Sequence, residues 1–158
     1  MKFIATIDEL ELFLGMELKK YAPKLASNHQ GLRISNFGTI VRNAIKLDDS
    51  DAVKIACAIL LKDPALPFGK LIKSGNARTL RQHPKLLSPA DQKAISKKTS
   101  QLLNLEFCPR ETEDYCKLVK SWGTELSCET AEMAHPIATK SKFLKAYLLQ
   151  PPALKQKN

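Results

Sequence analysis

Apolar residues along this chain recur three or four positions apart, as they do on one face of a helix, and turn-forming residues separate the runs. Five apolar side chains of the first run fall on one stripe: Ile7, Leu10, Leu14, Leu18 and Tyr21. Thr6 with Glu9 three residues later has the pattern of a capping box. We therefore predict a helix that begins at Ile7 and continues until Pro23.

This first helix has a second apolar side. Leu12 and Met16 lie opposite the main stripe, and Phe13 lies off it. A helix with two apolar faces is either sandwiched inside its domain or uses one face for association. Leu12 and Met16 are therefore a candidate interaction face.

Capping residues and prolines predict the helices that follow. After a polar break at residues 28–32, Ser35 is a possible cap for a second helix, and Asp49 or Ser50 for a third that is closed by Asp63. The remaining predicted starts are Pro67 for a fourth helix, Ser88 with Pro89 for a fifth over 89–105, and Cys108 with Pro109 for a sixth that ends at Gly123. Two more helices are expected near 128–134 and 139–149. Alternation of period two is hard to find, so we predict an all-α fold.

Three segments of the chain resemble one another: FGTIVRN at 37–43, FGKLIKS at 68–74 and YCKLVKS at 115–121. A second similarity, at a constant offset of 42, relates the stretches that begin at Asp49 and Asp91. If these are true repeats, the units are helical hairpins over 7–47, 49–82 and 89–123, followed by C-terminal helices over 128–149. The fold is then a short α-solenoid of about three helical hairpins; otherwise it is an irregular helical bundle whose helices share a degenerate pattern. In both cases the paired aliphatic residues are expected in the core, and only the cation after them is free to face a ligand.

The length of 158 residues, with 44% hydrophobic residues, fits one all-helical domain over 1–150 and a basic, flexible tail over 151–158. The net charge of +9 is unevenly distributed. Residues 1–63 sum to +1, 64–105 to +7, 106–139 to −4 and 140–158 to +5, which together give +9. Two basic blocks of this kind are typical of a surface that binds a polyanion, although a solvated, solubilising surface has the same composition.

We therefore predict a non-enzymatic module that binds DNA or RNA through its phosphate backbone, either alone or as a subunit of a nucleoprotein complex. Aromatic residues make up only 6% of the chain, so phosphate contacts should dominate over base stacking. The candidate phosphate-binding residues are Lys70, Lys73, Arg78, Arg81, Lys85, Lys93, Lys97 and Lys98, extended by Lys140, Lys142 and Lys145. Gly75 lies within the first of these basic stretches and predicts a kink there, or a close approach of the backbone to a partner.

Motifs for other chemistry are scarce. No glycine-rich phosphate loop is present, and His29, His83 and His135 are far apart in sequence, so we expect no metal, no cofactor and no enzyme activity. The four cysteines include no Cys-x-x-Cys pair and predict free, mostly buried thiols. Cys108 alone, beside Arg110 at a predicted helix N-terminus, suggests a reactive thiol and a weaker alternative function as a redox sensor.

A protein-interaction scaffold is the second hypothesis, in which the first helix or the acidic segment 106–139 docks a partner, such as another copy of the chain or a larger complex. An acidic protein surface would suit the basic block as well as nucleic acid does. Asp8 and Glu9 lie where an export signal would be apolar, and no apolar run is long enough to span a membrane. We therefore expect a cytoplasmic protein with no membrane contact.

Overall fold

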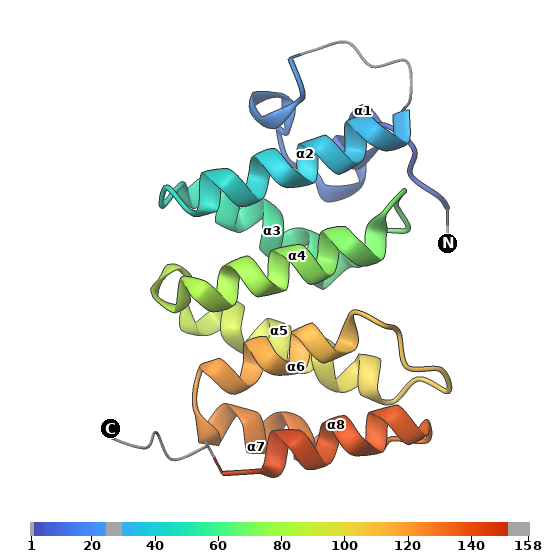
Figure 1. Ribbon diagram of the computed structural model, residues 1–158, viewed down its shortest axis with the longest axis vertical. Coiled ribbons are helices and arrows are strands. Elements are labelled where there is room, and N and C mark those ends of the chain that lie inside the picture. The colour runs from blue at the N-terminus through green and yellow to red at the C-terminus, as the bar shows by residue number, and fades with distance from the viewer. Residues whose placement is uncertain (1, 25–29, 152–158) are drawn as a thin grey trace, which may run out of the picture. The chain divides into compact units, whose positions relative to one another are not determined.

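The computed structural model describes residues 2–24 and 30–151 (Figure 1). Within these residues the chain forms eight α-helices and no strand, apart from an isolated bridge between Phe3 and Ala65. The predicted all-α class is confirmed. Across the same residues, no helix is both long enough and apolar enough to cross a bilayer. The predicted tail lies outside the described residues except for Pro151.

The chain divides into two compact units, Met1–Asp91 and Gln92–Asn158, which are described in turn. This division does not by itself distinguish one domain from two, so the single domain over 1–150 and the internal repeat stay predictions. The first unit contains the helices α1 (Ile7–Leu14), α2 (Gln30–Ile45), α3 (Ser50–Lys62) and α4 (Gly69–Gln82). Short 3-10 helices lie at Lys19–Tyr21 and Pro84–Leu86.

Helix α1 begins as predicted but ends earlier. The Thr6 hydroxyl accepts a hydrogen bond from the Glu9 N–H at 3.1 Å, which confirms the cap. Gly15, with φ 66°, adopts the left-handed conformation that closes a helix, and its N–H donates to Glu11 O. The helix predicted until Pro23 therefore stops at Leu14. The predicted stripe is nevertheless buried as a whole, because Leu18 and Tyr21 reach the core from the segment after the helix.

Helices α2, α3 and α4 pack against one another, and α1 packs on α3. Helix α2 begins at Gln30, so the predicted break at 28–32 and cap at Ser35 are wrong for the residues described. Helix α3 begins and ends as predicted: Asp49 accepts from the N–H groups of Asp51 and Ala52, and Asp63 closes the helix in the left-handed region. The Tyr21 hydroxyl donates to Asp49 at 2.8 Å and joins the first segment to α3.

Helix α4 starts two residues after Pro67 and is continuous through Gly75. The predicted kink is absent from it. The alternative expectation, a close approach of this backbone to a partner, stays a prediction. Within the chain, a Cβ atom on Gly75 would lie only 3.0 Å from the Arg42 side chain. In Figure 1, α2 and α4 lie side by side, with α3 behind them.

The second unit contains most of α5 (Pro89–Leu103), with α6 (Thr112–Ser121), α7 (Thr124–Glu132) and α8 (Thr139–Leu149). Ser88 caps α5 by accepting from the Asp91 N–H at 3.2 Å, as its position before Pro89 predicts. Helix α6 begins at Thr112, later than predicted. Helices α6, α7 and α8 pack together, and the Ser127 hydroxyl of α7 donates to Leu148 O of α8 at 2.6 Å.

Candidate nucleic-acid interface

Helix α4 carries basic residues and no acidic ones; indeed, no Asp or Glu occurs between Pro64 and Ala90. Its apolar side, with Ile72, Ala77 and Leu80, is buried in the first unit. Its solvent side exposes Lys70 and Arg78, with Arg81 half-buried. Helical spacing places Lys70 and Arg81 on one side of α4, with Arg78 at its edge.

Lys85 follows in the 3-10 helix Pro84–Leu86 and is exposed. We call Lys70, Arg78, Arg81 and Lys85 the α4 cations. No acidic residue lies among them in the sequence, so this stretch of chain contributes only positive charge. The result is a stretch of positive surface on a helix whose backbone is fixed by packing against α2 and α3.

Lys73 does not belong to this surface. Its side chain is 8% exposed, and its ammonium group lies 2.5 Å from an Asp63 carboxylate oxygen. The prediction that it shares the exposed arc with Lys70 and Arg81 is wrong, because the turn of the helix directs it towards the end of α3, where Asp63 is the closing residue. Lys73 therefore joins α4 to α3.

The aliphatic pair that precedes this cation in each similar segment is also less uniform than predicted. Val41, Ile72, Leu118 and Val119 are buried, but Ile40 is only half-buried and Leu71 is 66% exposed. The expectation that both members of each pair lie in the core is therefore wrong at Leu71, which lies on the solvent side of α4 with Arg78.

The other predicted cations belong to the second unit. On α5, Lys93 and Lys97 are exposed and Lys98 is half-buried. On α8, Lys140 and Lys142 are exposed. The Lys145 ammonium donates to Ala134 O at 2.8 Å, so it holds the segment before α8. Whether these cations form one patch with the α4 cations stays a prediction.

Arg42 on α2 was not among the predicted site residues. Its guanidinium lies at the contact between α2 and α4, and its Nη2 donates to the Thr39 hydroxyl at 3.1 Å. Burial lowers the pKa of this guanidinium. Its position in the sequence could have identified it as a candidate site residue, because Arg42 is the cation that directly follows the aliphatic pair in FGTIVRN.

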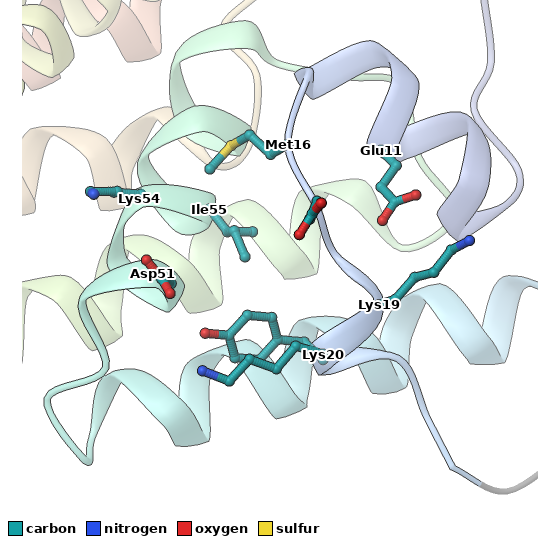
Figure 2. Close-up of a pocket in the computed structure, with 9 residues that line it drawn as sticks. Glu11, Met16, Lys19, Lys20, Asp51, Lys54 and Ile55 are labelled. Atoms are coloured by element: carbon teal, nitrogen blue, oxygen red, sulfur yellow. The ribbon is translucent and has the colours of Figure 1, made fainter.

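The predicted interaction face is divided between two places. Leu12 is 86% exposed on α1, but Met16 lies beyond the end of that helix, so the prediction of one helical face for both is wrong. Met16 instead lines a pocket of about 720 Å³ between the first segment and α3. Figure 2 shows Glu11 and Met16 on one side of this pocket and Asp51, Lys54 and Ile55 of α3 on the other.

The cysteines are free thiols in the structure, and Cys57, Cys108 and Cys116 are buried. Burial raises the pKa of Cys57 to about 12 and that of Cys116 further still. Cys108 lies in the loop before α6, whose first residue is Thr112, and its thiol is directed to Pro109 O at 3.7 Å. The predicted location at a helix N-terminus is therefore wrong, and the buried-thiol alternative describes this residue.

No group of three or more His, Cys, Asp or Glu side chains suited to a metal ion occurs in residues 2–24 and 30–151. His29 lies outside the described residues. Among known proteins, no family model, curated protein or solved structure matches this chain.

Proposed function

We propose that the chain is a non-enzymatic module that binds nucleic acid through its phosphate backbone. The observation that carries the proposal is the group of α4 cations, three exposed and Arg81 half-buried, on the packed helix α4 and the 3-10 helix that follows it, in a stretch with no acidic residue. Lysine and arginine side chains in such a row neutralise phosphates and release condensed counterions, which gives affinity without base recognition. We place this activity in the cytoplasm, where four unpaired cysteines would stay reduced.

Four phosphate contacts predict a definite salt dependence. For duplex DNA, log K should fall against log salt with a slope of about −3.6, since each contact contributes about −0.9. Single-stranded nucleic acid should give a shallower slope of about −2.8. Sequence preference should be weak, because contacts to phosphates carry no sequence information directly.

The test is a fluorescence-anisotropy titration against duplex DNA, single-stranded DNA and RNA at several salt concentrations. The site variant is Lys70→Glu/Arg81→Glu/Lys85→Glu, and the matched control is Lys2→Glu/Lys24→Glu/Lys54→Glu, which reverses three exposed cations elsewhere in the first unit. We expect loss of binding in the site variant and a much smaller effect in the control. If both variants lose the same affinity, binding depends on net charge and not on the α4 cations, which would contradict the proposal.

Lys73 is left out of the site variant for a physical reason. A glutamate at this position would lie beside Asp63 in a buried site, so it would unfold the first unit whether or not the protein binds nucleic acid. The exposed cations test binding without this complication.

A second candidate function, a protein-interaction scaffold, is supported by the exposed apolar side chains of α1. Leu12 is 86% exposed and the adjacent Phe13 is 39% exposed. The partner is another copy of the chain or another protein. Sedimentation velocity of wild type and Leu12→Ser/Phe13→Ser tests self-association: a change from oligomer to monomer supports it, and a monomeric wild type ends that form of the hypothesis.

A further inference from the structure

The guanidinium of Arg42 occupies a space that two glycines leave between α2 and α4. A Cβ atom on Gly75 would lie 3.0 Å from both Cδ and Nη1 of Arg42, and one on Gly38 would lie 3.3 Å from Nη1. Contacts of 3.0–3.3 Å are tighter than nine in ten that real Cβ atoms make, so the neighbouring side chain would have to shift by a few tenths of an ångström. Side chains at these two positions would therefore displace the guanidinium, and the glycines let it lie against the backbone of both helices.

The hydrogen bonds of this guanidinium leave its charge uncompensated. Nη2 donates to the Thr39 hydroxyl at 3.1 Å, and that hydroxyl donates to Ser35 O at 3.3 Å. Nη1 is buried and has no acceptor within the described part of the chain. Within the same residues, Arg42 makes no ion pair with a carboxylate.

The surroundings add positive charge. Neither α2 nor α4 contains an Asp or Glu, whereas α2 also carries Arg33 and α4 carries Lys70, Arg78 and Arg81. Arginine keeps its proton at any ordinary pH even when desolvation lowers its pKa, so the site holds a permanent cation. Half-burying a charge without a partner is unfavourable, and an anion at its open edge would offset that cost.

We infer that Arg42 and Thr39 form an anion site between α2 and α4 that takes one phosphate group of the bound nucleic acid. The source of the phosphate rests on the proposed function; the anion site does not. The second N–H of Nη2, at the exposed edge, is the donor to the phosphate oxygens. The Thr39 hydroxyl accepts from the other N–H of Nη2 and holds the guanidinium in place, and the buried Nη1 contributes its charge. A guanidinium held against backbone is already ordered, so little entropy is lost when the anion binds.

The experiment has two arms. In the first, the anisotropy titration compares wild type with Arg42→Gln and with Arg33→Gln, a matched loss of one arginine on the same helix. We expect Arg42→Gln to weaken binding about tenfold and to reduce the salt slope by about one, and Arg33→Gln to change affinity less. In the second arm, inorganic phosphate is titrated into ¹⁵N-labelled protein, and the amide signals of Gly38 and Gly75 are followed by NMR. We expect both signals to shift in wild type and not in Arg42→Gln.

The two arms separate the anion site from the proposed function. If wild type binds nucleic acid and Arg42→Gln binds equally well, the inference is wrong and the proposed function stands. If wild type binds no nucleic acid but phosphate shifts the two glycine signals, the site stands and its phosphate comes from another source. If phosphate leaves both signals unmoved, there is no anion site.

A second variant covers the case in which Arg42→Gln does not fold. Gly75→Ala retains the arginine and adds a Cβ atom 3.0 Å from it, and alanine favours the helix over glycine. We expect this variant to fold and to lose the phosphate-induced shift at Gly38. A shift that persists in the folded Gly75→Ala protein would overturn the inference.

Discussion

The contact of α4 with α2 and its contact with α3 both contain a cation from the same position of two similar segments, yet the two cations differ in their surroundings. Lys73 lies against α3 and forms a 2.5 Å ion pair with Asp63. Arg42 lies against α4, where it meets glycine backbone and a hydroxyl but no carboxylate. Both residues are cations at the same position of their segments. We therefore infer that the presence or absence of a neighbouring carboxylate decides which cation is structural and which can bind a ligand.

The third similar segment shows another solution. Lys120 on α6 donates to Gln150 O at 3.0 Å and to Tyr147 O at the end of α8, and its ammonium lies 4.2 Å from the centre of the Tyr147 ring. The carbonyl groups at a helix C-terminus carry partial negative charge. They therefore stabilise the Lys120 ammonium, as the Asp63 carboxylate stabilises that of Lys73. The expectation that only this cation is free to face a ligand is therefore wrong for Lys73 and Lys120.

The largest effect on stability is expected from breaking the Lys73 pair. Lys73→Met leaves Asp63 charged and partly buried at the end of α3, and should lower the free energy of unfolding by about 3 kcal/mol. Urea denaturation measures this, with Lys70→Met on the exposed side of α4 as the control, expected to change stability by less than about 0.5 kcal/mol. Equal values for the two variants would mean that Lys73 is not structural.

A smaller loss is expected at Lys120. Lys120→Met removes the charged donor from the C-terminal carbonyls of α8 but keeps an apolar stem over Tyr147, so we expect about 1–2 kcal/mol. Urea denaturation of this variant is compared with Lys117→Met on the same helix, where only an exposed pair with Glu113 is lost. If Lys117→Met costs as much, the Lys120 contacts do not fasten α8.

Asp49 gives a third, pH-dependent test, because it is a carboxylate whose charge is satisfied without a buried cation. The hydrogen bond from Tyr21 is the largest cause that holds the pKa of Asp49 below its usual range, and the N–H groups of α3 add to it. The stabilisation is thus complete above the unfolded pKa, about 3.9, and is lost as the pH falls through the lower folded pKa.

We expect Asp49→Ala to cost about 1 kcal/mol at pH 7 through loss of the α3 cap. Tyr21→Phe should reduce the loss of stability on acidification below about pH 4, relative to wild type. Thermal unfolding followed from pH 2 to 7 measures both. If stability falls below about pH 4 by the same amount in Tyr21→Phe as in wild type, the Tyr21 hydrogen bond does not lower the pKa of Asp49.

The smallest effect on stability is expected at Arg42. Arg42→Met replaces a half-buried, unneutralised charge by an apolar side chain of similar length, so desolvation relief offsets the lost hydrogen bond to Thr39. We expect a change within about 0.5 kcal/mol, measured in urea beside Lys73→Met. A loss as large as that of Lys73→Met would make both cations structural and remove the contrast between the two contacts.

Local signals in the sequence predicted much of the fold. Thr6, Asp49 and Ser88 cap helices in the structure as their spacing indicates, since a cap depends on residues only a few positions away. The end of α1 was missed because Leu18 and Tyr21 continue the helical stripe, although the chain reaches the core there after a left-handed turn at Gly15.

The site was predicted less well, because burial of a cation depends on what packs against it. A helical wheel cannot show that Asp63 closes α3 beside Lys73, or that Gly38 and Gly75 leave a space for Arg42. For the same reason Lys70 and Lys85, which need only an exposed position and no partner, lie where the sequence placed them.

The most direct test of the proposed function is the slope of log K against log salt for duplex DNA, measured for wild type and for Lys70→Glu/Arg81→Glu/Lys85→Glu. We predict a wild-type slope of about −3.6 from the four α4 cations alone, and of about −4.5 when Arg42 binds a fifth phosphate. Binding should be too weak to measure in the variant, while the matched control keeps a slope near that of wild type. Absence of binding by wild type at low salt, or the same slope in both variants, would contradict it.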